Sequence, residues 1–393
     1  MRRHAALVAL WLALLPVRVC QAADRVVAIG DVHGAYQEFV SILQTAGLIG
    51  KDLNWTGGKT ILVQTGDVLD RGPESRKAED LLTALVDKAR RQGGEVRPLL
   101  GNHEVMLMTG FMTYTVPEDY QSFAGADSEK VRQREFQDYV KYREKRAARF
   151  KQPKPQFGNA EREAWMKAHP PGYFEMRRAY ASDGQYGRLL RRRDAVTQVD
   201  DTVFLHGGLA PEILPFKSVR EINERVRKEL EVVDQAEASL ASRGILWRYL
   251  NIEEVKAEVE AEAKALQAEK NPPDPELEPL LAIDRLVLYA NNGPLWYRGY
   301  AQQPEGELAA SLDRVLQQFG VKRMVMGHTV LGRSITPRFG GKAILIDTGM
   351  LVSFFQGRPS ALEITGGTLK ALYAGEPPQA VASGAAAGAS QTQ

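Results

Sequence analysis

Three short apolar runs in the first hundred residues each end at a glycine-flanked block of acidic, amide or histidine side chains. The runs cover residues 25–29, 60–65 and 95–100, and helical spacing follows the first two blocks, over 36–46 and 73–92. Such runs predict buried strands, and their repetition predicts βαβ units with the polar side chains at the carboxyl ends of the strands. The blocks are Gly30-Asp31-Val32-His33-Gly34, Gly66-Asp67-Val68-Leu69-Asp70-Arg71-Gly72 and Gly101-Asn102-His103-Glu104.

Two later blocks, His206-Gly207-Gly208 and Gly327-His328, follow strand candidates at 201–205 and 323–326. The chain has six histidines, and four of them lie inside the five blocks. Histidines used only for packing would be scattered, so this distribution indicates a shared site. Of the other two, His4 lies in the signal peptide predicted below, and His169, which precedes two prolines, is predicted to be an exposed loop residue.

The blocks supply carboxylate oxygens, an amide oxygen and imidazole nitrogens, which are the donors that a pair of first-row divalent ions prefers. A hydroxide that bridges two such ions would attack a phosphate ester directly. Mn, Fe and Zn all fit these donors, and Mn is the ion expected to activate the protein in vitro. Six residues are candidate ligands: Asp31 and His33 for one ion, Asp67 as the bridge, and Asn102, His206 and His328 for the other.

Further residues are expected to act on the substrate. The planar guanidinium of Arg71 can bind two phosphate oxygens at once, and Asn102 is also expected beside the substrate. His103 is the candidate general acid that protonates the leaving alkoxide, with Asp70 fixing its tautomer. Arg298, in the segment 293–299, is the candidate for a second cation that stabilises the developing charge.

Two long charged segments separate the blocks. Residues 112–194, rich in Arg, Lys, Glu and Tyr, are predicted to form a mostly helical insertion over the site, and residues 212–290 form a second helical insertion. Strand candidates follow at 343–346, 361–364 and 369–373, as antiparallel strands and a hairpin. Residues 376–393 lack periodicity and are predicted to be a disordered tail.

The N-terminus is typical of an export signal. Arg2 and Arg3 precede an apolar run over 5–17, and Cys20 and Ala22 suit cleavage after position 22. Because the run is short for a membrane span, we expect export to the bacterial periplasm without stable membrane insertion. Cys20 is the only cysteine, so cleavage would leave neither a disulfide nor a cysteine nucleophile. A formal net charge of +2 gives no indication of nucleic-acid binding.

The blocks resemble those of the calcineurin-type metallophosphoesterases, in particular the phosphoprotein phosphatase branch. That family carries Gly-Asp-x-His-Gly, Gly-Asp-x-x-Asp-Arg-Gly, Gly-Asn-His-Glu and later His-Gly-Gly and His segments, of which the first four stand intact and in order here. The signal peptide, the insertions and the segment around Arg298 resemble the bacterial Shewanella-like subgroup. The resemblance implies an α/β fold, a β-sandwich flanked by helices over about residues 24–373. It also implies the six metal ligands named above, with His103 as acid, Asp70 as its orienter and Arg71 on phosphate.

The expected reaction is hydrolysis of phosphate monoesters on a phosphorylated protein or peptide. The eukaryotic branch carries Ser-Ala-Pro-Asn-Tyr after its last histidine, whereas this chain reads Ile346-Asp347-Thr348-Gly349-Met350. The choice between phosphoserine, phosphothreonine and phosphotyrosine therefore stays open. Two alternatives are a dinucleoside polyphosphate hydrolase, whose enzymes share the Asp-Arg-Gly-Pro segment, and a catalytically silent metal-dependent binding module. His103 and Arg71 argue against the second, since binding alone needs no acid.

Overall fold

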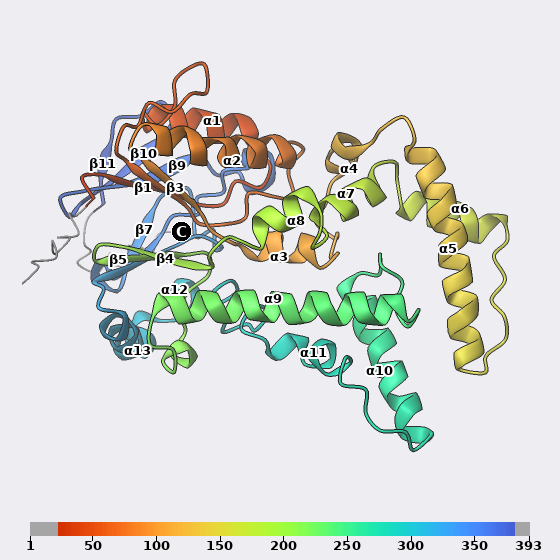
Figure 1. Cartoon of the computed structure of the whole chain (residues 1–393). Helices are drawn as coiled ribbons and strands as arrows, with labels where there is room; N and C mark the ends of the chain where they lie inside the picture. The colour runs from red at the N-terminus through yellow and green to blue at the C-terminus, as the bar shows by residue number, and fades with distance from the viewer. Residues whose placement is uncertain (1–22, 382–393) are drawn as a thin grey trace, which may run out of the picture.

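The computed structural model describes residues 23–381. The predicted signal peptide and residues 382–393 of the predicted tail lie outside the described residues. Two β-sheets lie on one side of the molecule, on the left in Figure 1, and helices cover their outer faces. The predicted α/β sandwich flanked by helices is confirmed, while the division of the chain into signal peptide, domain and tail stays a prediction.

The first sheet consists of β1 (Val26–Ile29), β2 (Ile61–Gln64), β3 (Glu95–Pro98), β9 (Ser360–Thr365), β10 (Thr368–Tyr373) and β11 (Gln379–Ala380). Their order is β11-β10-β9-β1-β2-β3. β1, β2 and β3 are parallel, as the repeated strand-and-block pattern predicts, with Val26 beside Ile61 and Ile61 beside Glu95. The predicted hairpin is formed by β9 and β10.

The second sheet consists of β4 (Val196–Val199), β5 (Thr202–Leu205), β6 (Arg323–Met326), β7 (Thr336–Arg338) and β8 (Ala343–Leu345). Their order is β4-β5-β6-β8-β7, with β5, β6 and β8 parallel. The antiparallel direction predicted for 343–346 is therefore wrong for the pairing of β8 with β6, and holds only for its pairing with β7. β7 escapes prediction because it is a short edge strand that contains Pro337, which only edge strands tolerate.

Helices cover the outer face of each sheet (Figure 1). α1 (Tyr36–Thr45) and α2 (Ser75–Arg91) lie over the first sheet, and α9 (Val219–Ser242) and α13 (Glu305–Phe319) lie over the second. Between the sheets, buried aliphatic side chains pack with Phe204 and Tyr373 into a core of their own. This core fixes the two sheets relative to each other, and with them the blocks at their strand ends.

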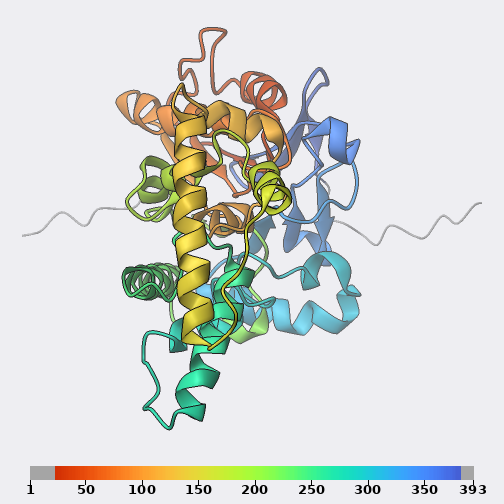
Figure 2. The same ribbon diagram turned by 90° about the vertical axis from the view of Figure 1, so that its right-hand side faces the viewer.

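The insertions extend from one side of the sandwich (Figure 1). Figure 2 shows α5 (Ser128–Arg149) running along this side, with α9 seen end-on. The two insertions share a second hydrophobic core around Trp165, Phe174 and Trp247. Their elements besides α9 are α4 (Pro117–Phe123), α5 (Ser128–Arg149), α6 (Asn159–Ala168), α7 (Tyr173–Tyr180), α8 (Gln185–Leu190), η1 (Pro211–Ile213), α10 (Ile252–Ala268), α11 (Glu278–Leu281) and η2 (Ile283–Arg285).

Two local predictions are wrong. His169 is not an exposed loop residue, because its ring stacks on Trp165 with 4.1 Å between the ring centroids, inside the second core. The tail is not disordered from residue 376 onward, because β11 pairs with β10 and the Val381 N–H donates to the Leu369 carbonyl oxygen. Both errors involve partners distant in sequence, which local patterns do not reveal.

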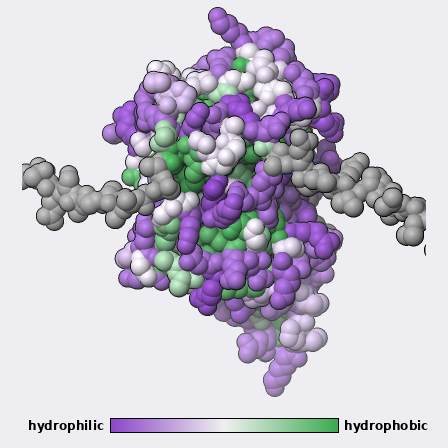
Figure 3. Space-filling view, turned by 90° about the vertical axis from the view of Figure 1, so that its left-hand side faces the viewer, coloured by the Kyte–Doolittle hydropathy of each residue, from purple (hydrophilic) through white to green (hydrophobic). Residues whose placement is uncertain are grey.

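The remaining elements are short: α3 (Asn102–Met108), α12 (Gly299–Gln302), η3 (Phe339–Gly341) and α14 (Val352–Phe355). α3 begins inside the third block, where the sequence indicates only a turn. Among residues 23–381, no helix is both long enough and apolar enough to cross a bilayer. The face opposite the insertions is hydrophilic at its rim, with hydrophobic residues gathered over its middle (Figure 3).

Glu104 joins the second block to the third. Its buried carboxylate accepts three backbone N–H groups: Oε2 accepts those of Asp67 and Gly101, both at 2.8 Å, and Oε1 accepts that of Val68 at 2.9 Å. Gly66 permits this approach, since its φ is 95° and a Cβ there would lie 2.3 Å from the Gly101 nitrogen. One carboxylate thus fixes the turn that presents Asp67 against the start of α3.

Replacing Glu104 with Gln should destabilise the fold. The amide nitrogen would face at least one backbone N–H, and each buried donor left without an acceptor costs about 1–3 kcal/mol. Urea unfolding followed by circular dichroism measures the loss in free energy of unfolding. Glu95→Gln, at the exposed start of β3, is the control and should change this value by less than about 0.5 kcal/mol. Equal stability of the two variants would contradict the role given to Glu104.

Candidate active site

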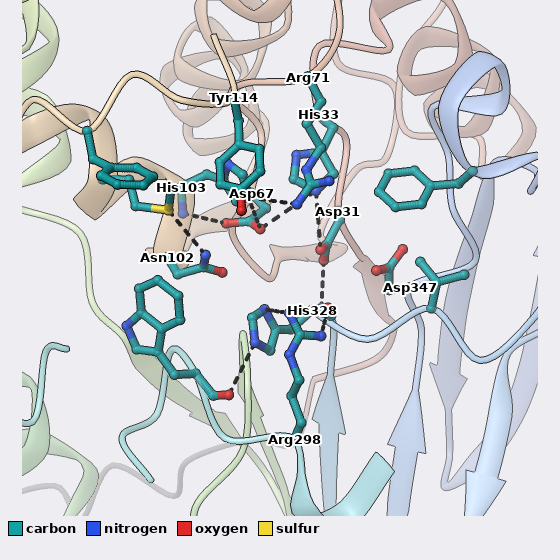
Figure 4. Close-up of a pocket in the computed structure, with 15 residues that line it drawn as sticks. Asp31, His33, Asp67, Arg71, Asn102, His103, Tyr114, Arg298, His328 and Asp347 are labelled. Carbon is teal, nitrogen blue, oxygen red and sulfur yellow. Dashed lines mark hydrogen bonds and ion pairs between the residues drawn. The ribbon is translucent and has the colours of Figure 1, made fainter. Parts of the chain in front are cut away.

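The five blocks meet at one cavity of about 320 Å³, at the carboxyl ends of the parallel strands (Figure 4). Asp31 and His328 meet here although 297 positions separate them in the chain. Two predicted residues, Asp70 and His206, are fully buried and do not line the cavity, although both contact residues that do. The other eight predicted residues line it: Asp31, His33, Asp67, Arg71, Asn102, His103, Arg298 and His328.

Backbone carbonyls orient the imidazoles of His33 and His206. His33 Nδ1 lies 3.1 Å from the Leu69 carbonyl oxygen, and His206 Nδ1 lies 3.0 Å from that of Thr65. A carbonyl accepts only from an N–H, so each ring carries its proton on Nδ1 and presents the Nε2 lone pair toward Asp67. Histidines that bind metals are held in this way by a hydrogen bond from the opposite ring nitrogen.

Asp67 lies at the centre of the donors. Its Oδ2 is 3.2 Å from His206 Nε2 and 3.7 Å from His33 Nε2, while its Oδ1 accepts the backbone N–H of His103 at 2.9 Å. The candidate ligand atoms form two groups, Asp67 with His33 and His103, and Asp67 with His206 and His328. Within each group the atoms lie within 4.8 Å of one another. Two neighbouring ion positions that share one carboxylate fit this arrangement.

Asn102 and Asp31 add the remaining oxygens. Asn102 Oδ1 lies 2.8 Å from His206 Nε2, and Asp31 Oδ2 lies 3.8 Å from His33 Nε2. Asp31 Oδ1 also accepts the backbone N–H of His328 at 2.9 Å, which joins the first block to the last. Each candidate ion position therefore has at least one oxygen donor of its own besides Asp67.

Burial sets the charge state of this donor set. It lowers the pKa of His33 to about 3 and holds the pKa of His328 well below its usual value. Burial also raises the pKa of Asp31, and repulsion from Asp347 and Asp67 adds to the effect. Imidazoles must be neutral to bind metal, and a cation would relieve the repulsion between the acids. The residues present therefore fit a pair of divalent ions.

His103 is held between an acid and an arginine. Its Nδ1 lies 2.9 Å from Asp70 Oδ2, and its Nε2 lies 3.3 Å from Arg71 Nη2. Asp70 is itself fixed, because its Oδ1 accepts from Thr115 Oγ1 at 2.9 Å. Burial alone would lower the pKa of His103, but the charge of Asp67 and the hydrogen bond with Asp70 outweigh it, so the pKa is raised. A protonated imidazole beside a phosphate-binding arginine is placed to donate a proton.

His103 could instead be a metal ligand, since its Nε2 is also 3.8 Å from Asp67 Oδ2. The Arg71 guanidinium, 3.3 Å from Nε2, repels a bound ion and a protonated ring alike, so this contact does not separate the two roles. The raised pKa of His103 fits a proton donor, whereas burial lowers the pKa of His33 and His328. Asp31, with its oxygen 3.8 Å from His33 Nε2, takes the place of His103 in the first group.

Two arginines reach the cavity from different sides: Arg71 lies beside His33, and Arg298 beside His328 (Figure 4). Arg298 Nη1 donates to the His328 carbonyl oxygen at 2.6 Å and to Thr329 Oγ1 at 3.0 Å. His328 Nε2 lies 3.2 Å from the Trp296 carbonyl oxygen, and its Nδ1 lies 3.4 Å from Arg298 Nη2. Because the carbonyl accepts the Nε2 proton, Nδ1 carries the lone pair that could bind an ion. Arg298 thus holds the fifth block in place and also brings a positive charge to the cavity.

An aromatic collar, formed by Tyr114, Phe354 and Phe355, surrounds the Arg71 side chain. The guanidinium carbon lies 4.7 Å from the ring centroid of Tyr114, and 5.2 and 5.5 Å from those of Phe354 and Phe355. Cation–π contacts of this kind hold the guanidinium in position. Tyr114 is 40% exposed and Phe354 is 58% exposed, so the collar leaves an apolar surface open to solvent beside the phosphate-binding arginine.

The collar and Asp347 are site features that sequence reasoning misses. Tyr114 belongs to the first insertion and Phe355 to α14, and neither lies near a block in the sequence. Asp347 lines the cavity and is 5% exposed. One sequence signal does mark it. Like the acids of the first two blocks, Asp347 follows an apolar strand candidate, 343–346, and a glycine, Gly349, stands close after it.

Backbone strain gathers at the site. A non-glycine residue with positive φ carries backbone strain of about 1–3 kcal/mol. Close packing holds them in place: a Cβ at Gly72 would lie 2.2 Å from the His33 carbonyl oxygen. Of the eleven non-glycine residues with positive φ among residues 23–381, five belong to the blocks: His33, Asp67, Asp70, Arg71 and His328.

The chain is similar to known proteins. The calcineurin-like phosphoesterase family matches this chain over residues 24–332, which include all five blocks. The chain is 30% identical over 361 residues to the uncharacterized protein C1840.07c of Schizosaccharomyces pombe, covering 89% of this chain and 81% of that protein. It is 30% identical over 353 residues to Shewanella-like protein phosphatase 2 of Arabidopsis thaliana, covering 87% and 75% respectively.

A solved structure shares the fold. The cold-active protein-tyrosine phosphatase of a psychrophilic Shewanella species superposes with a TM-score of 0.58 at 24% identity, covering 91% of this chain and 80% of that chain. The family match, the two relatives and the geometry of the blocks agree. The chain belongs to the calcineurin-like phosphoesterase family and is a metal-dependent phosphatase.

Proposed function

We propose that this protein is a two-metal phosphatase that hydrolyses phosphate monoesters on proteins or peptides in the bacterial periplasm. The proposal rests on two groups of donors that share Asp67, with His103 and Arg71 at the same cavity. When bound, two divalent ions polarise the phosphate oxygens and lower the pKa of the attacking water. Attack is direct, without a phosphorylated enzyme residue. The name of the Arabidopsis relative supports a protein substrate.

The side chains around the cavity bind and orient the ester. Arg71 offers its guanidinium to two phosphate oxygens, and Arg298 balances the charge that develops on the phosphoryl group. As the P–O bond breaks, His103 donates its Nε2 proton to the leaving oxygen. Asp70 keeps the other ring proton on Nδ1, so that Nε2 faces the substrate.

The aromatic collar favours an aromatic leaving group. Tyr114 and Phe354 present exposed rings beside Arg71, the residue expected to bind the phosphate. The ring of a phosphotyrosine can pack on these side chains while its phosphate reaches Arg71, whereas a phosphoserine has no group to fill that space. Phosphotyrosine is therefore the substrate that we expect the site to prefer.

Two measurements would distinguish this function from the two alternatives, a dinucleoside polyphosphate hydrolase and a binding module without activity. A dinucleoside polyphosphate hydrolase would turn over diadenosine tetraphosphate faster than a phosphopeptide, so the ratio of the two kcat/KM values decides. A catalytically silent binding module would take up metal yet show no turnover. Failure of pure, ion-loaded protein on both p-nitrophenyl phosphate and phosphopeptides would favour it.

His103→Ala should lose turnover while keeping both ions. General acid catalysis contributes about 10²–10⁴-fold, so kcat on a phosphopeptide should fall by that factor. The fall should be much smaller on p-nitrophenyl phosphate, because nitrophenolate leaves readily without a proton. Elemental analysis of the dialysed protein counts the ions, and loss of one of them would assign His103 as a ligand.

Asp67→Asn should weaken the loading of both ions together, because a single carboxylate serves both positions. Equilibrium dialysis against Mn²⁺ measures the number of ions and their affinities. Asp80→Asn, on the exposed side of α2, is the matched control and should bind two ions as the wild type does. Retention of two tightly bound ions by Asp67→Asn would contradict the bridging role.

Removing the collar should change substrate preference. Tyr114→Ala combined with Phe354→Ala should lower kcat/KM on a phosphotyrosine peptide by roughly three- to tenfold relative to the matched phosphoserine peptide, the value of one or two aromatic contacts. Leu281→Ala, a similarly exposed apolar residue in the second insertion, should leave the ratio unchanged. An equal loss on both peptides would show that the collar acts only by positioning Arg71.

A further inference from the structure

The cavity contains a third carboxylate that the six candidate ligands do not include. Asp347 lies on the loop after β8, lines the cavity and is 5% exposed. Its carboxylate points toward that of Asp31 (Figure 4). Asp347 therefore approaches the first ion position from the second sheet, across from the residues that the first block supplies.

The backbone around Asp347 is locked against the first block. A Cβ at Gly30 would lie 2.9 Å from the Ile346 carbonyl oxygen and 3.2 Å from the Asp347 Cα, so the two strand ends are in close contact. The Ile346 N–H donates to the Met326 carbonyl oxygen at 2.8 Å, which continues the pairing of β8 with β6. Although Asp347 lies on a loop, these contacts with both sheets fix the position of its backbone.

One local role for Asp347 is visible, and it uses only one carboxylate oxygen. Oδ1 accepts the Gly349 N–H at 3.0 Å, which closes a tight turn. A serine or asparagine would close the same turn without a negative charge. The turn alone therefore does not account for an acid here, where burying a second carboxylate beside Asp31 costs free energy unless a cation lies between them.

The nearby arginines do not supply that cation. Arg298 is directed to the His328 carbonyl oxygen and Thr329, and Arg71 to His103 and the collar. No ion pair joins either arginine to Asp31 or Asp347 within the described part of the chain. Three acids, namely Asp31, Asp67 and Asp347, thus line one cavity, and neither arginine forms an ion pair with Asp31 or Asp347.

We propose that Asp347 is a further ligand of the ion held by Asp31, His33 and Asp67; this inference rests on the two-ion function proposed above. The first ion position then has three carboxylates and one imidazole. The second has one carboxylate, one amide and two imidazoles, from Asp67, Asn102, His206 and His328. Because carboxylates suit Mn²⁺ and imidazoles suit Fe and Zn, the two positions should differ in metal preference.

The test compares metal binding by the wild type and by Asp347→Asn, which keeps an oxygen for the Gly349 N–H but removes the charge. Calorimetric titration of metal-free protein with Mn²⁺ should give two ions per chain for both. For one of the two ions, the affinity of the variant should be at least about tenfold weaker, as expected when a residue of a metal site is lost. The electron paramagnetic resonance signal of Mn²⁺ should show a single isolated ion at concentrations that fill both wild-type positions.

The thermal stability of the metal-free protein separates a ligand from a structural residue. If Asp347 only repels Asp31 in the absence of metal, Asp347→Asn in EDTA should melt at a temperature no lower than that of the wild type. Its gain in melting temperature on adding Mn²⁺ should be smaller. Asp347→Ser, which also retains a turn acceptor, should behave in the same way. A lower melting temperature of both variants in EDTA would assign Asp347 to the fold and overturn the proposal.

Asp119→Asn is the matched control for loss of a buried acid. Asp119 on α4 is buried, lies outside the cavity and accepts from Ser75 Oγ at 3.2 Å, so its replacement should leave both ion affinities unchanged. Unchanged affinities in Asp347→Asn, or equal weakening of both ions, would overturn the proposal for Asp347 alone. Wild-type protein that binds fewer than two ions would refute the two-metal function itself, which keeps the two failures distinguishable.

Discussion

The Asp67 residue is the point at which the blocks are joined, and the rest of the site depends on it. Its carbonyl oxygen accepts the backbone N–H groups of Val32 and His33, both at 2.9 Å. Its own N–H is bound by Glu104, and its carboxylate contacts His103 and His206. Burial raises the pKa of this acid, yet the neighbouring imidazoles, His206 first, hold it well below its usual value. Asp67 is therefore charged in a dry environment, which makes it a strong site for cations.

Chemistry and substrate choice are carried by different parts of the chain. The sheets supply the metal donors from positions that close packing and strained backbone hold rigid. The collar comes from the first insertion and from α14, which do not belong to the sheets. Several contacts join the two systems. The Arg71 N–H donates to the Tyr114 carbonyl oxygen at 2.9 Å, Thr115 Oγ1 donates to Asp70 at 2.9 Å, and the Phe355 ring stacks on that of His33. The first insertion and α14 therefore help to orient Arg71 and the candidate ligand His33, so the proposed substrate preference is coupled to the candidate metal centre.

What could be predicted from the sequence depended on whether the signal was local. The blocks were predictable because each consists of a strand, a glycine and a ligand within a few residues, and because successive parallel strands end at the same edge. Arg298 was proposed because a phosphate site calls for a second cation, and the segment 293–299 also resembles the Shewanella-like subgroup. Tyr114, Asp347 and the stacking of His169 on Trp165 depend on partners far along the chain. The direction of β8 could not be read either, because β7 and β8 have only three residues each and an apolar run of that length fits both directions.

The two sheets contribute unlike donors to the candidate metal centre. The first sheet and α3 deliver Asp31, His33, Asp67 and Asn102, whereas the second delivers His206, His328 and Asp347. The separation between donors from opposite sheets is set by the core between them, where side chains such as Val63 and Phe204 are fully buried. Protein cores of this kind are close-packed, so a change of one methylene shifts the sheets or opens a cavity. The distance between the two ion positions is therefore a property of the hydrophobic packing, and a substitution in this core acts on the metal centre without touching any ligand.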